Sequence, residues 1–358
     1  MQDMLISLNG KIVTKENANI SLVNNAFLYG FGVLETMRTY YGQIFRLDDH
    51  IERLFESAKG LKLSTKWNDE KITYEMLRAL QQFNFENINR IEARNPRDIS
   101  WVNQPAKKLC TENKSDSRFC GIDSGIEVRI RIILTETDLI IMMQNLEEKP
   151  KEYYEKGVKL VSFSGKRTLP KIKKIADAFC YSSKQYALKK DAYESVFIDD
   201  SDFVRECTYS NIFWVKDEQV FTVEEDVLFG ITRDQVIEIV NSFKSGDIEL
   251  VKTKGSSQET LNQQKATPSV IPATCPPKLQ RRRKAGIYEN QVADKNSKFL
   301  FQNIKYKDLL KADEIFITQT TSGILPVVEI DEIKIGEGKP GKMTKNLIKK
   351  LNKLVWKN

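Results

Sequence analysis

The stretch that decides the fold is "LPKIKKIADAFCYSSKQYALKKDAYESVFIDDSDFVRECTYSNIFWV", residues 169–215. Its composition predicts a helix over residues 175–189, because apolar and small residues recur there at helical spacing. "ESVFIDD" (194–200) and "NIFWV" (211–215) are short runs rich in β-branched and aromatic residues, which predict strands. A helix between strands indicates a mixed α/β fold.

Three lysines open this stretch within four residues: Lys171, Lys173 and Lys174. Neighbouring cations lower one another's pKa, and a lysine amine with a lowered pKa is a nucleophile toward carbonyl groups. Such a cluster is also typical of a solvated helix start, and an isolated acid such as Glu206 is typical of a strand end at the surface. The stretch alone therefore does not decide its chemistry.

The sequence on either side of the stretch divides into two halves that each mix strands and helices. The split falls near residues 160–166, which predicts a small N-terminal domain at 1–160, a linker at 161–166 and a larger domain at 167–358. In the first half we expect strands within residues 5–13, 33–46 and 128–144, and helices at 47–61 and 69–83. In the second half we expect further strands at 158–167 and 311–331, and helices at 233–240 and 341–356.

Two segments, residues 92–128 and 255–302, lose this pattern and are predicted to be inserts that form mobile loops. The second holds eight Lys/Arg against three Asp/Glu, and therefore most of the net charge of +7. Its "RRRK" run (281–284) leaves nucleic-acid or partner binding as an alternative. Tyr288 is the one aromatic near that run, so a base-stacking surface is not indicated and nucleic acid is not an expected partner.

Composition also excludes several classes of protein. No apolar run approaches the roughly 20 residues that span a bilayer, and the N-terminus lacks the features of a signal peptide. The five cysteines form no CxxC pair, which favours free thiols and a cytoplasmic location. His50 is the only histidine, so a histidine-rich metal site is excluded and no metal is expected.

Two further patterns are compatible with an anion site. Ile231 and Thr232 precede an amphipathic helix, and we interpret Thr232 as its N-cap. Thr320 and Thr321 end a predicted strand in "ITQTTSG". Arg53 lies opposite the apolar stripe of its predicted helix, where it is either a solvated arginine or a phosphate ligand.

Six motifs, taken in order, resemble the fold-type IV pyridoxal-phosphate enzymes, a family that includes branched-chain aminotransferases, D-amino acid aminotransferases and aminodeoxychorismate lyases. They are "LYGFGVLETMR", "HIERLFESA", "LPKIKK", "VRECTYSNIFWV", "GITRDQVIE" and "FITQTTSGILPV". The resemblance covers most of the chain outside the two inserts. It implies a homodimer of two-domain chains, each with a small N-terminal α/β domain and a larger C-terminal α/β pseudo-barrel that binds pyridoxal 5'-phosphate.

The resemblance also implies the roles of individual residues. Lys173 matches the catalytic lysine that forms the Schiff base with the cofactor, and Glu206 matches the carboxylate that faces its pyridine nitrogen. The remaining residues match phosphate ligands and substrate-pocket positions of the family. The phosphate ligands are Arg53, Ile231, Thr232 and Thr320, and the pocket residues are Tyr29, Leu34 and Thr321.

The substrate is less closely defined, because the motifs agree with different members of the family. Tyr29 resembles branched-chain enzymes, whereas "TYSNIFW" and Ala178 depart from them. "RIRIILTET" lacks the arginine–glycine pair that binds the carboxylate in D-amino acid enzymes, and Phe31 replaces an acid. We expect an aminotransferase for aliphatic, branched-chain amino acids and 2-oxoglutarate. The alternatives are an aminodeoxychorismate lyase that releases pyruvate, a D-amino acid aminotransferase and an inactive relative.

Overall fold

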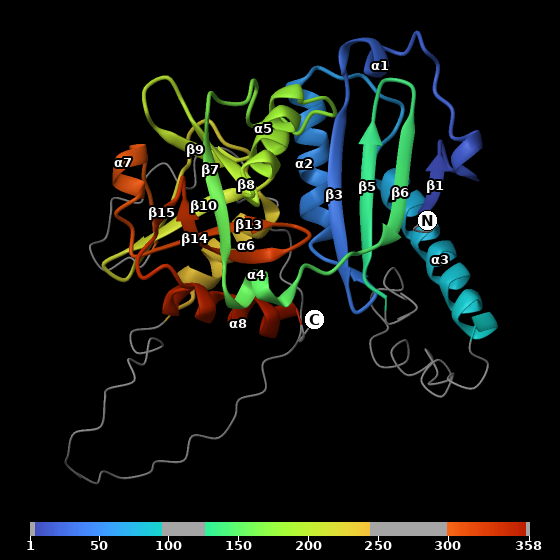
Figure 1. Ribbon diagram of the computed structural model, residues 1–358. Coiled ribbons are helices and arrows are strands. Elements are labelled where there is room, and N and C mark those ends of the chain that lie inside the picture. Colours follow the sequence, from blue (N-terminus) through green and yellow to red (C-terminus); the bar gives the residue numbers. More distant parts are fainter. Residues whose placement is uncertain (1–3, 95–125, 244–298, 356–358) are drawn as a thin grey trace.

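The computed structural model describes residues 4–94, 126–243 and 299–355, which form two sheets with separate hydrophobic cores (Figure 1). The mixed α/β class predicted from the sequence is confirmed. Within these residues no helix is long and apolar enough to cross a membrane.

The N-terminal sheet has six strands in the order β2-β1-β6-β5-β3-β4, and every pairing in it is antiparallel. Its strands are β1 (Met4–Leu8), β2 (Lys11–Val13), β3 (Val33–Tyr40), β4 (Gln43–Ile44), β5 (Val128–Leu134) and β6 (Leu139–Asn145). The 3-10 turn η1 (Lys15–Asn17) and the short helix α1 (Asn25–Tyr29) lie between β2 and β3.

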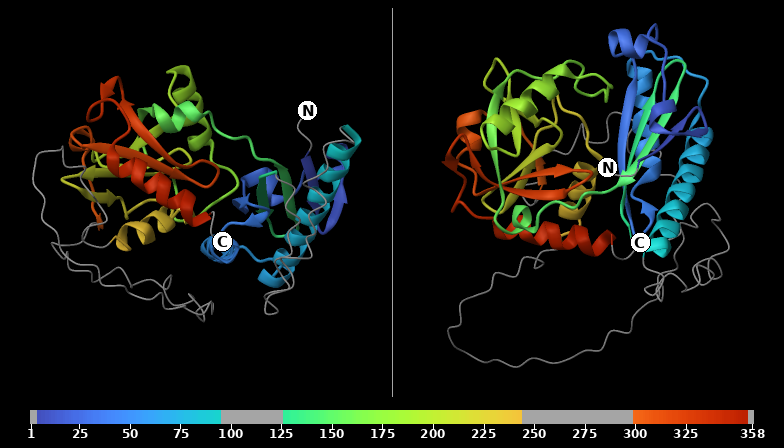
Figure 2. Two further views of the ribbon diagram at one scale, coloured as in Figure 1. Left: turned by 90° about the horizontal axis from the view of Figure 1, so that it is seen from below. Right: turned by 45° about the vertical axis from the view of Figure 1, so that its right-hand side comes forward.

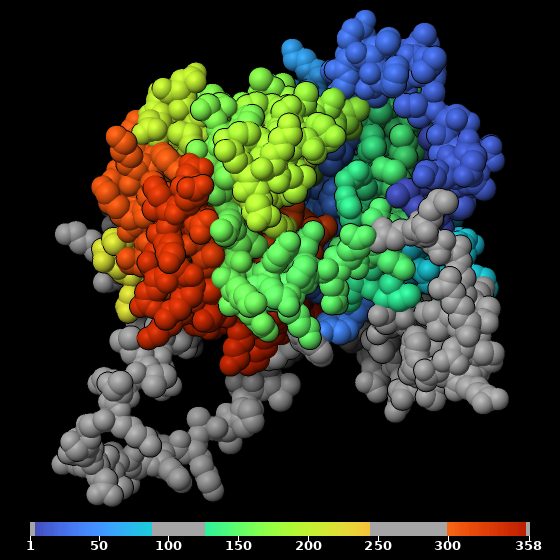
Figure 3. All heavy atoms as spheres, in the orientation of Figure 1, coloured from blue at the N-terminus to red at the C-terminus, as the bar shows by residue number. Residues whose placement is uncertain are grey.

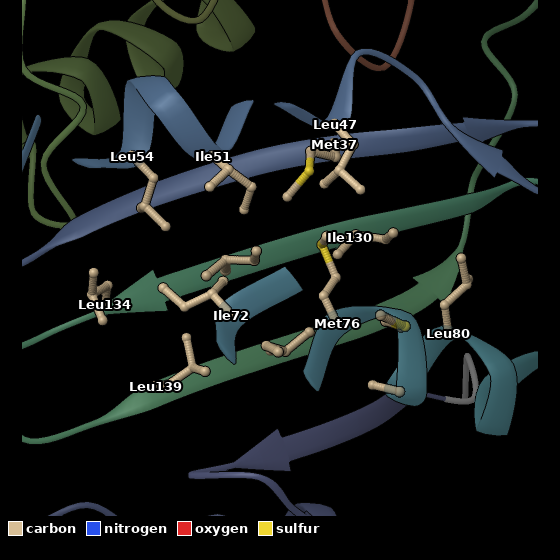
Figure 4. Packing of buried hydrophobic residues seen from close by; sticks show 14 of the residues in the cluster. Met37, Leu47, Ile51, Leu54, Ile72, Met76, Leu80, Ile130, Leu134 and Leu139 are labelled. Atoms are coloured by element: carbon tan, nitrogen blue, oxygen red, sulfur yellow. The ribbon is translucent and has the colours of Figure 1, made fainter. Parts of the chain in front are cut away.

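One face of this sheet is buried because its strands alternate apolar and polar residues, which point to opposite faces. Helices α2 (Leu47–Gly60) and α3 (Asp69–Arg94) cover that face. Figure 4 shows Met37, Ile130 and Leu139 of three adjacent strands packing against side chains of these helices. The other face carries Leu34 and half-exposed polar residues, and it turns toward the second sheet (Figure 2).

The C-terminal sheet has nine strands, and its path runs β12-β11-β10-β13-β14-β7-β8-β9, with β15 paired to β14. The pairings of β7 with β8 and β14 are parallel, as is that of β11 with β12. The strands are β7 (Val158–Ser164), β8 (Glu194–Ile198), β9 (Val204–Cys207), β10 (Asn211–Lys216), β11 (Gln219–Thr222), β12 (Phe299–Phe301), β13 (Glu314–Gln319), β14 (Gly323–Ile330) and β15 (Ile333–Lys334). Its helices are α4 (Lys151–Glu155), α5 (Ala178–Lys189), α6 (Ile231–Asn241), α7 (Tyr306–Leu309) and α8 (Lys342–Val355).

Several predicted boundaries shift. The helix expected from residue 175 begins at Ala178, because the Asp177 side chain caps it by accepting a hydrogen bond from the Cys180 N–H. Helix α3 continues to Arg94, so it includes the first three residues of the first predicted insert. The predicted linker, residues 161–166, lies within and just after β7, so the chain passes between the sheets earlier, between β6 and β7.

The end of the second predicted insert was wrong. Strand β12 lies inside the range 255–302, pairs with β11, and buries Phe299. Three residues are too few for a strand to show its alternation, so the sequence pattern missed it. The remainder of that segment, with the basic run at 281–284 and Tyr288, lies outside the described residues, as do most of residues 92–128.

The two sheets meet along β3, through the backbone at the edge of the strand and through a side chain on its face. Its residue Val33 forms an isolated bridge with Lys174, and the Leu34 N–H donates to the Lys173 carbonyl over 2.9 Å. At the other end of the strand, Nη1 of Arg38 lies 3.4 Å from the carbonyl oxygen of Thr321. The space-filling view shows the C-terminal half of the chain lying against the N-terminal half on this side (Figure 3). The motifs of both halves therefore converge on one seam.

Candidate active site

The loop that carries Lys173 joins β7 to α5 and is fixed against the N-terminal domain at and just after Lys173. Lys173 donates its backbone N–H to Oγ of Ser57 on α2 over 3.2 Å. Two residues later, the N–H of Ile175 donates to the carbonyl of Gly32 over 3.1 Å. The loop thus behaves as a short extra strand beside β3, and it holds Lys173 at the seam between the domains.

The three lysines of the loop differ in their surroundings. Lys171 is exposed, and Nζ of Lys174 donates to Oγ1 of Thr168 over 2.6 Å. Lys173 is partly buried, and among the described residues its Nζ has no hydrogen-bond or ion-pair partner. Burial, reinforced by the nearby guanidinium of Arg53, lowers the pKa of Lys173 to about 8. Of the three, Lys173 therefore has the amine best suited to nucleophilic chemistry.

Glu206 ends up buried rather than at the surface. It lies in β9, where Nη1 of Arg167 contacts one carboxylate oxygen at 3.2 Å and the N–H of Leu228 donates to the other over 3.1 Å. Burial raises the pKa of Glu206, and the Arg167 guanidinium opposes that rise. Glu206 and Lys173 lie close enough for each charge to alter the pKa of the other.

Arg53 is also buried, and it belongs to a charged network that the sequence analysis missed. Its Nε and Nη2 each donate to the Glu35 carboxylate over 2.7 Å. Nδ1 of His50 lies 2.8 Å from the same carboxylate, so His50 is part of this network and not merely a residue at the start of a helix. Burial disfavours the ionised form of Glu35, yet Arg53 and His50 hold its pKa below the usual range.

The guanidinium of Arg53 reaches the start of α6. Its Nη1 donates to the carbonyl oxygen of Phe229 over 2.8 Å, immediately before the N-cap residue Gly230. The interpretation of Thr232 as the N-cap was wrong, since Thr232 is the second residue of the helix and is buried there. A Cβ at Gly230 would lie 2.2 Å from Oδ1 of Asn211, so the close turn requires glycine. We therefore predict one anion-binding end here, made of Arg53 and the amides of Ile231 and Thr232.

Thr320 and Thr321 lie in the turn between β13 and β14. The Thr321 hydroxyl donates to Oε1 of Gln319 over 3.3 Å, and the phenol of Tyr193 donates to the same oxygen. The register of β10 with β13 sets Asn211 opposite Thr318, which brings this turn close to the start of α6. Thr320 is therefore near the anion-binding end, whereas the Thr321 hydroxyl is already used within the turn.

The three predicted pocket residues, Tyr29, Leu34 and Thr321, do not all lie together within one chain. Leu34 lies beside Lys173 through the backbone hydrogen bond between them. Tyr29, at the end of α1, is 79% exposed. Across the described residues, no three His, Cys, Asp or Glu side chains come together as metal ligands.

The site therefore gathers an amine of lowered pKa, a buried carboxylate and an anion-binding helix start from both halves of the chain. The amine, the carboxylate and the helix start follow one another along the chain in the same order as the motifs that predicted them. The roles assigned to these residues remain predictions.

Comparison with known proteins identifies the family. The sequence model for Amino-transferase class IV matches residues 32–254, more than half of the chain. A protein of Methanocaldococcus jannaschii, provisionally named a branched-chain-amino-acid aminotransferase, is 27% identical over 360 residues, with 99% of this chain and 97% of the relative covered. The D-alanine aminotransferase of Bacillus licheniformis is 24% identical over 347 residues, with 96% and 94% covered.

Solved structures agree on the fold. The branched-chain amino acid aminotransferase of T.th., solved with pyridoxamine 5'-phosphate, superposes with a TM-score of 0.65 at 20% identity, and the match covers 98% of this chain and 93% of that one. At this identity the likeness concerns the fold, which is that of fold type IV. The chain belongs to the class IV aminotransferases, a family of pyridoxal-phosphate-dependent transaminases.

Proposed function

We propose that this protein binds pyridoxal 5'-phosphate at Lys173 and transfers an amino group between an aliphatic, branched-chain amino acid and 2-oxoglutarate. The observation that carries the proposal is the environment of Lys173: a partly buried amine between Arg53 and Glu206, with its pKa lowered to about 8. Branched-chain donors are favoured by the name of the M. jannaschii relative, which matches nearly the whole chain.

The donor groups fit this cofactor. A guanidinium has five N–H donors, and Arg53 uses three of them on Glu35 and Phe229, which leaves two for a phosphate. The amides at the start of α6 supply further donors and a favourable dipole, which matters because the charge of Arg53 is already offset by Glu35. A buried carboxylate such as Glu206 suits a protonated pyridine nitrogen.

The bound cofactor supplies an electron sink for the substrate α-carbon. With a pKa near 8, Lys173 is partly neutral at physiological pH, so its amine can take a proton from the α-carbon and return it. Arg167 faces Glu206 and favours its ionised form against the effect of burial, and an ionised carboxylate favours a proton on its hydrogen-bond partner. The turn at residues 319–323 and the exposed face of β3 bound the space left for the substrate.

The acceptor is proposed from the charge on that face. Arg129 and Arg131 lie on it, and Arg131 pairs with Thr36 across the strands. Nε of Arg131 is buried and has no hydrogen-bond partner among the described residues. An unpartnered guanidinium edge suits the second carboxylate of a dicarboxylic acid such as 2-oxoglutarate.

An amino-donor panel tests the proposal. Purified protein with pyridoxal 5'-phosphate and 2-oxoglutarate is expected to form glutamate from leucine, isoleucine or valine. D-Alanine as the sole active donor would assign it instead to the activity named in the B. licheniformis relative. Pyruvate release from aminodeoxychorismate without transamination would support the lyase and overturn the proposal.

The acceptor has its own test. Arg131→Gln is expected to raise KM for 2-oxoglutarate by at least about tenfold, the loss of one charge-assisted hydrogen bond, and to leave KM for a monocarboxylic 2-oxo acid nearly unchanged. An equal change in KM for both acceptors would show that Arg131 does not bind the second carboxylate.

We also propose that the enzyme is a cytoplasmic homodimer. The segment around α1 exposes a run of apolar side chains, which a second copy would cover: Ile20, Leu22, Val23, Phe27, Leu28 and Tyr29. Covering Tyr29 is needed for its predicted pocket role. The free thiols of Cys180 and Cys207 are compatible with a reducing compartment. Sedimentation at micromolar concentration is expected to give twice the chain mass, and a monomer that retains activity would contradict the dimer.

A further inference from the structure

A buried arginine, Arg167, contacts Glu206 and also reaches the backbone next to Lys173, so it connects the two proposed catalytic groups. It lies in the same loop between β7 and α5 as Lys173, six residues before it, and is 8% exposed. Its three nitrogens reach three different parts of the site. Nη1 contacts Glu206 at 3.2 Å, Nη2 donates to the carbonyl of Ile172 over 3.1 Å, and Nε donates to Asp177 over 3.2 Å.

The contact with Ile172 matters because that residue immediately precedes Lys173. The peptide bond between Ile172 and Lys173 is therefore held from two directions: Arg167 binds its carbonyl, and Ser57 accepts its N–H. Asp177 in turn caps α5 through Cys180. One guanidinium thus fixes the strand that carries Glu206, the lysine loop and the start of α5.

The same guanidinium is a positive charge facing both groups. It lowers the pKa of Lys173 and opposes the rise in the pKa of Glu206 that burial causes. The other charged or titratable groups that act on Lys173 come from α2, β3 and β9, and they are Arg53, His50, Glu35 and Glu206. Those that act on Glu206 are Arg167, Lys173 and the thiols of Cys180 and Cys207.

We propose that Arg167 is a positioning residue that ties the Glu206 carboxylate to the Lys173 loop and supplies the positive charge that both groups face. The inference rests on the proposed function, since it assigns Arg167 to the same cofactor site. The role proposed for Arg167 differs from that of Arg53, whose guanidinium binds Glu35 and the carbonyl of Phe229 at the start of α6.

The first test uses protein loaded with pyridoxal 5'-phosphate. Arg167→Gln is expected to move the midpoint of the pH titration of the bound chromophore upward by about 1 pH unit, because a neighbouring cation has been removed. Arg167→Lys keeps the charge and should restore much of that shift. The matched control is Arg205→Gln, which breaks another buried pair on β9, with Asp199, and should leave the midpoint unchanged.

The second test uses the protein without cofactor. Arg167→Gln leaves Glu206 buried without its counter-ion, so the stability lost should grow as pH rises, and adding Glu206→Gln should recover it. Adding Glu206→Gln to Arg205→Gln should recover nothing. An unmoved chromophore midpoint, or no recovery in the double variant, would overturn the inference. If the wild-type protein takes up no cofactor, the proposed function fails, and this second test alone decides whether Arg167 is the counter-ion of Glu206.

Discussion

Arg53 and Glu35 form a buried bidentate ion pair, with two N–H···O contacts of 2.7 Å between α2 and β3. The pair orients the guanidinium so that its far edge meets the carbonyl of Phe229 at the start of α6. One carboxylate of the N-terminal domain thereby sets the position of the proposed phosphate ligand against the C-terminal domain.

Glu35→Gln is expected to reduce the free energy of unfolding by about 3 kcal/mol, because the buried charge of Arg53 loses its counter-ion. It should also weaken pyridoxal 5'-phosphate binding, since the guanidinium is then free to turn. Urea unfolding and fluorescence titration with the cofactor measure the two effects. Glu218→Gln, an exposed carboxylate in the turn after β10, is the control and should change neither. A stable variant with unaltered cofactor affinity would contradict the role assigned to the pair.

Lys173→Ala is expected to abolish turnover by several orders of magnitude and to remove the absorbance band of lysine-bound cofactor, roughly 400–430 nm. The substitution removes both the covalent role and the proton-transfer role proposed for Lys173. Lys171→Ala and Lys174→Ala are matched controls that should stay within about tenfold of wild type, a barrier change of about 1.4 kcal/mol.

Borohydride reduction followed by peptide mapping checks the same residue directly. Cofactor trapped on Lys171 or Lys174 would show that the motif is read in the wrong register. The structure gives a reason to expect otherwise, since Lys171 is exposed and Nζ of Lys174 is bonded to Thr168.

The sequence predicts features that depend on neighbouring residues better than contacts between residues far apart in the chain. Local periodicity was sufficient for α2, α6 and α8, since their apolar residues recur at helical spacing. It could not decide whether Arg53 faces solvent or binds a phosphate, because an apolar stripe shows only one of the sides on which a helix packs. Helix α2 packs on the N-terminal sheet and also meets the C-terminal domain through Arg53 and Ser57.

Glu35 carried a signal that was available in the sequence. In "VLETMRTY" it alternates in phase with Val33 and Met37, so an acid occupies the buried face of a strand. An acid at such a position requires a partner. Its partners, His50 and Arg53, come from the next helix, and that pairing depends on how the helix crosses the sheet. Arg167 is harder still, because its three acceptors belong to segments that only the folded chain brings together.

Glu194 gives the protein an expected pH dependence of stability. It is 1% exposed, one of its oxygens has no hydrogen-bond partner among the described residues, and burial raises its pKa to about 7. The folded state therefore binds a proton more tightly than the unfolded state, so stability falls as pH rises from about 4.5 to about 7 and stays lower above that.

Glu194→Gln should remove this loss. At pH 8.5 the variant is expected to be more stable than wild type by up to about 3 kcal/mol, and at pH 4.5 the gain should vanish. Chemical unfolding at several pH values measures the difference, with Glu332→Gln, an exposed carboxylate, as the control. A gain that is the same at both pH values would show that Glu194 is not the titrating group.

The segment between α6 and β12 is expected to be dispensable for cofactor binding up to a sharp limit. None of the proposed site residues lies between residues 255 and 297, so a Gly/Ser link in place of that range should preserve the cofactor band and reduce binding to polyanions.

Extending the replacement to residue 302 removes β12, which adds to the edge of the large sheet through Val220–Phe299 pairing and buries Phe299 against that core. The longer deletion should therefore lower the melting temperature by several degrees, since deleting a buried aromatic side chain costs about 3–5 kcal/mol. Loss of the cofactor band in a folded protein with the shorter deletion would show that residues 255–297 shape the site, and equal stability of the two deletions would show that β12 does not stabilise the sheet.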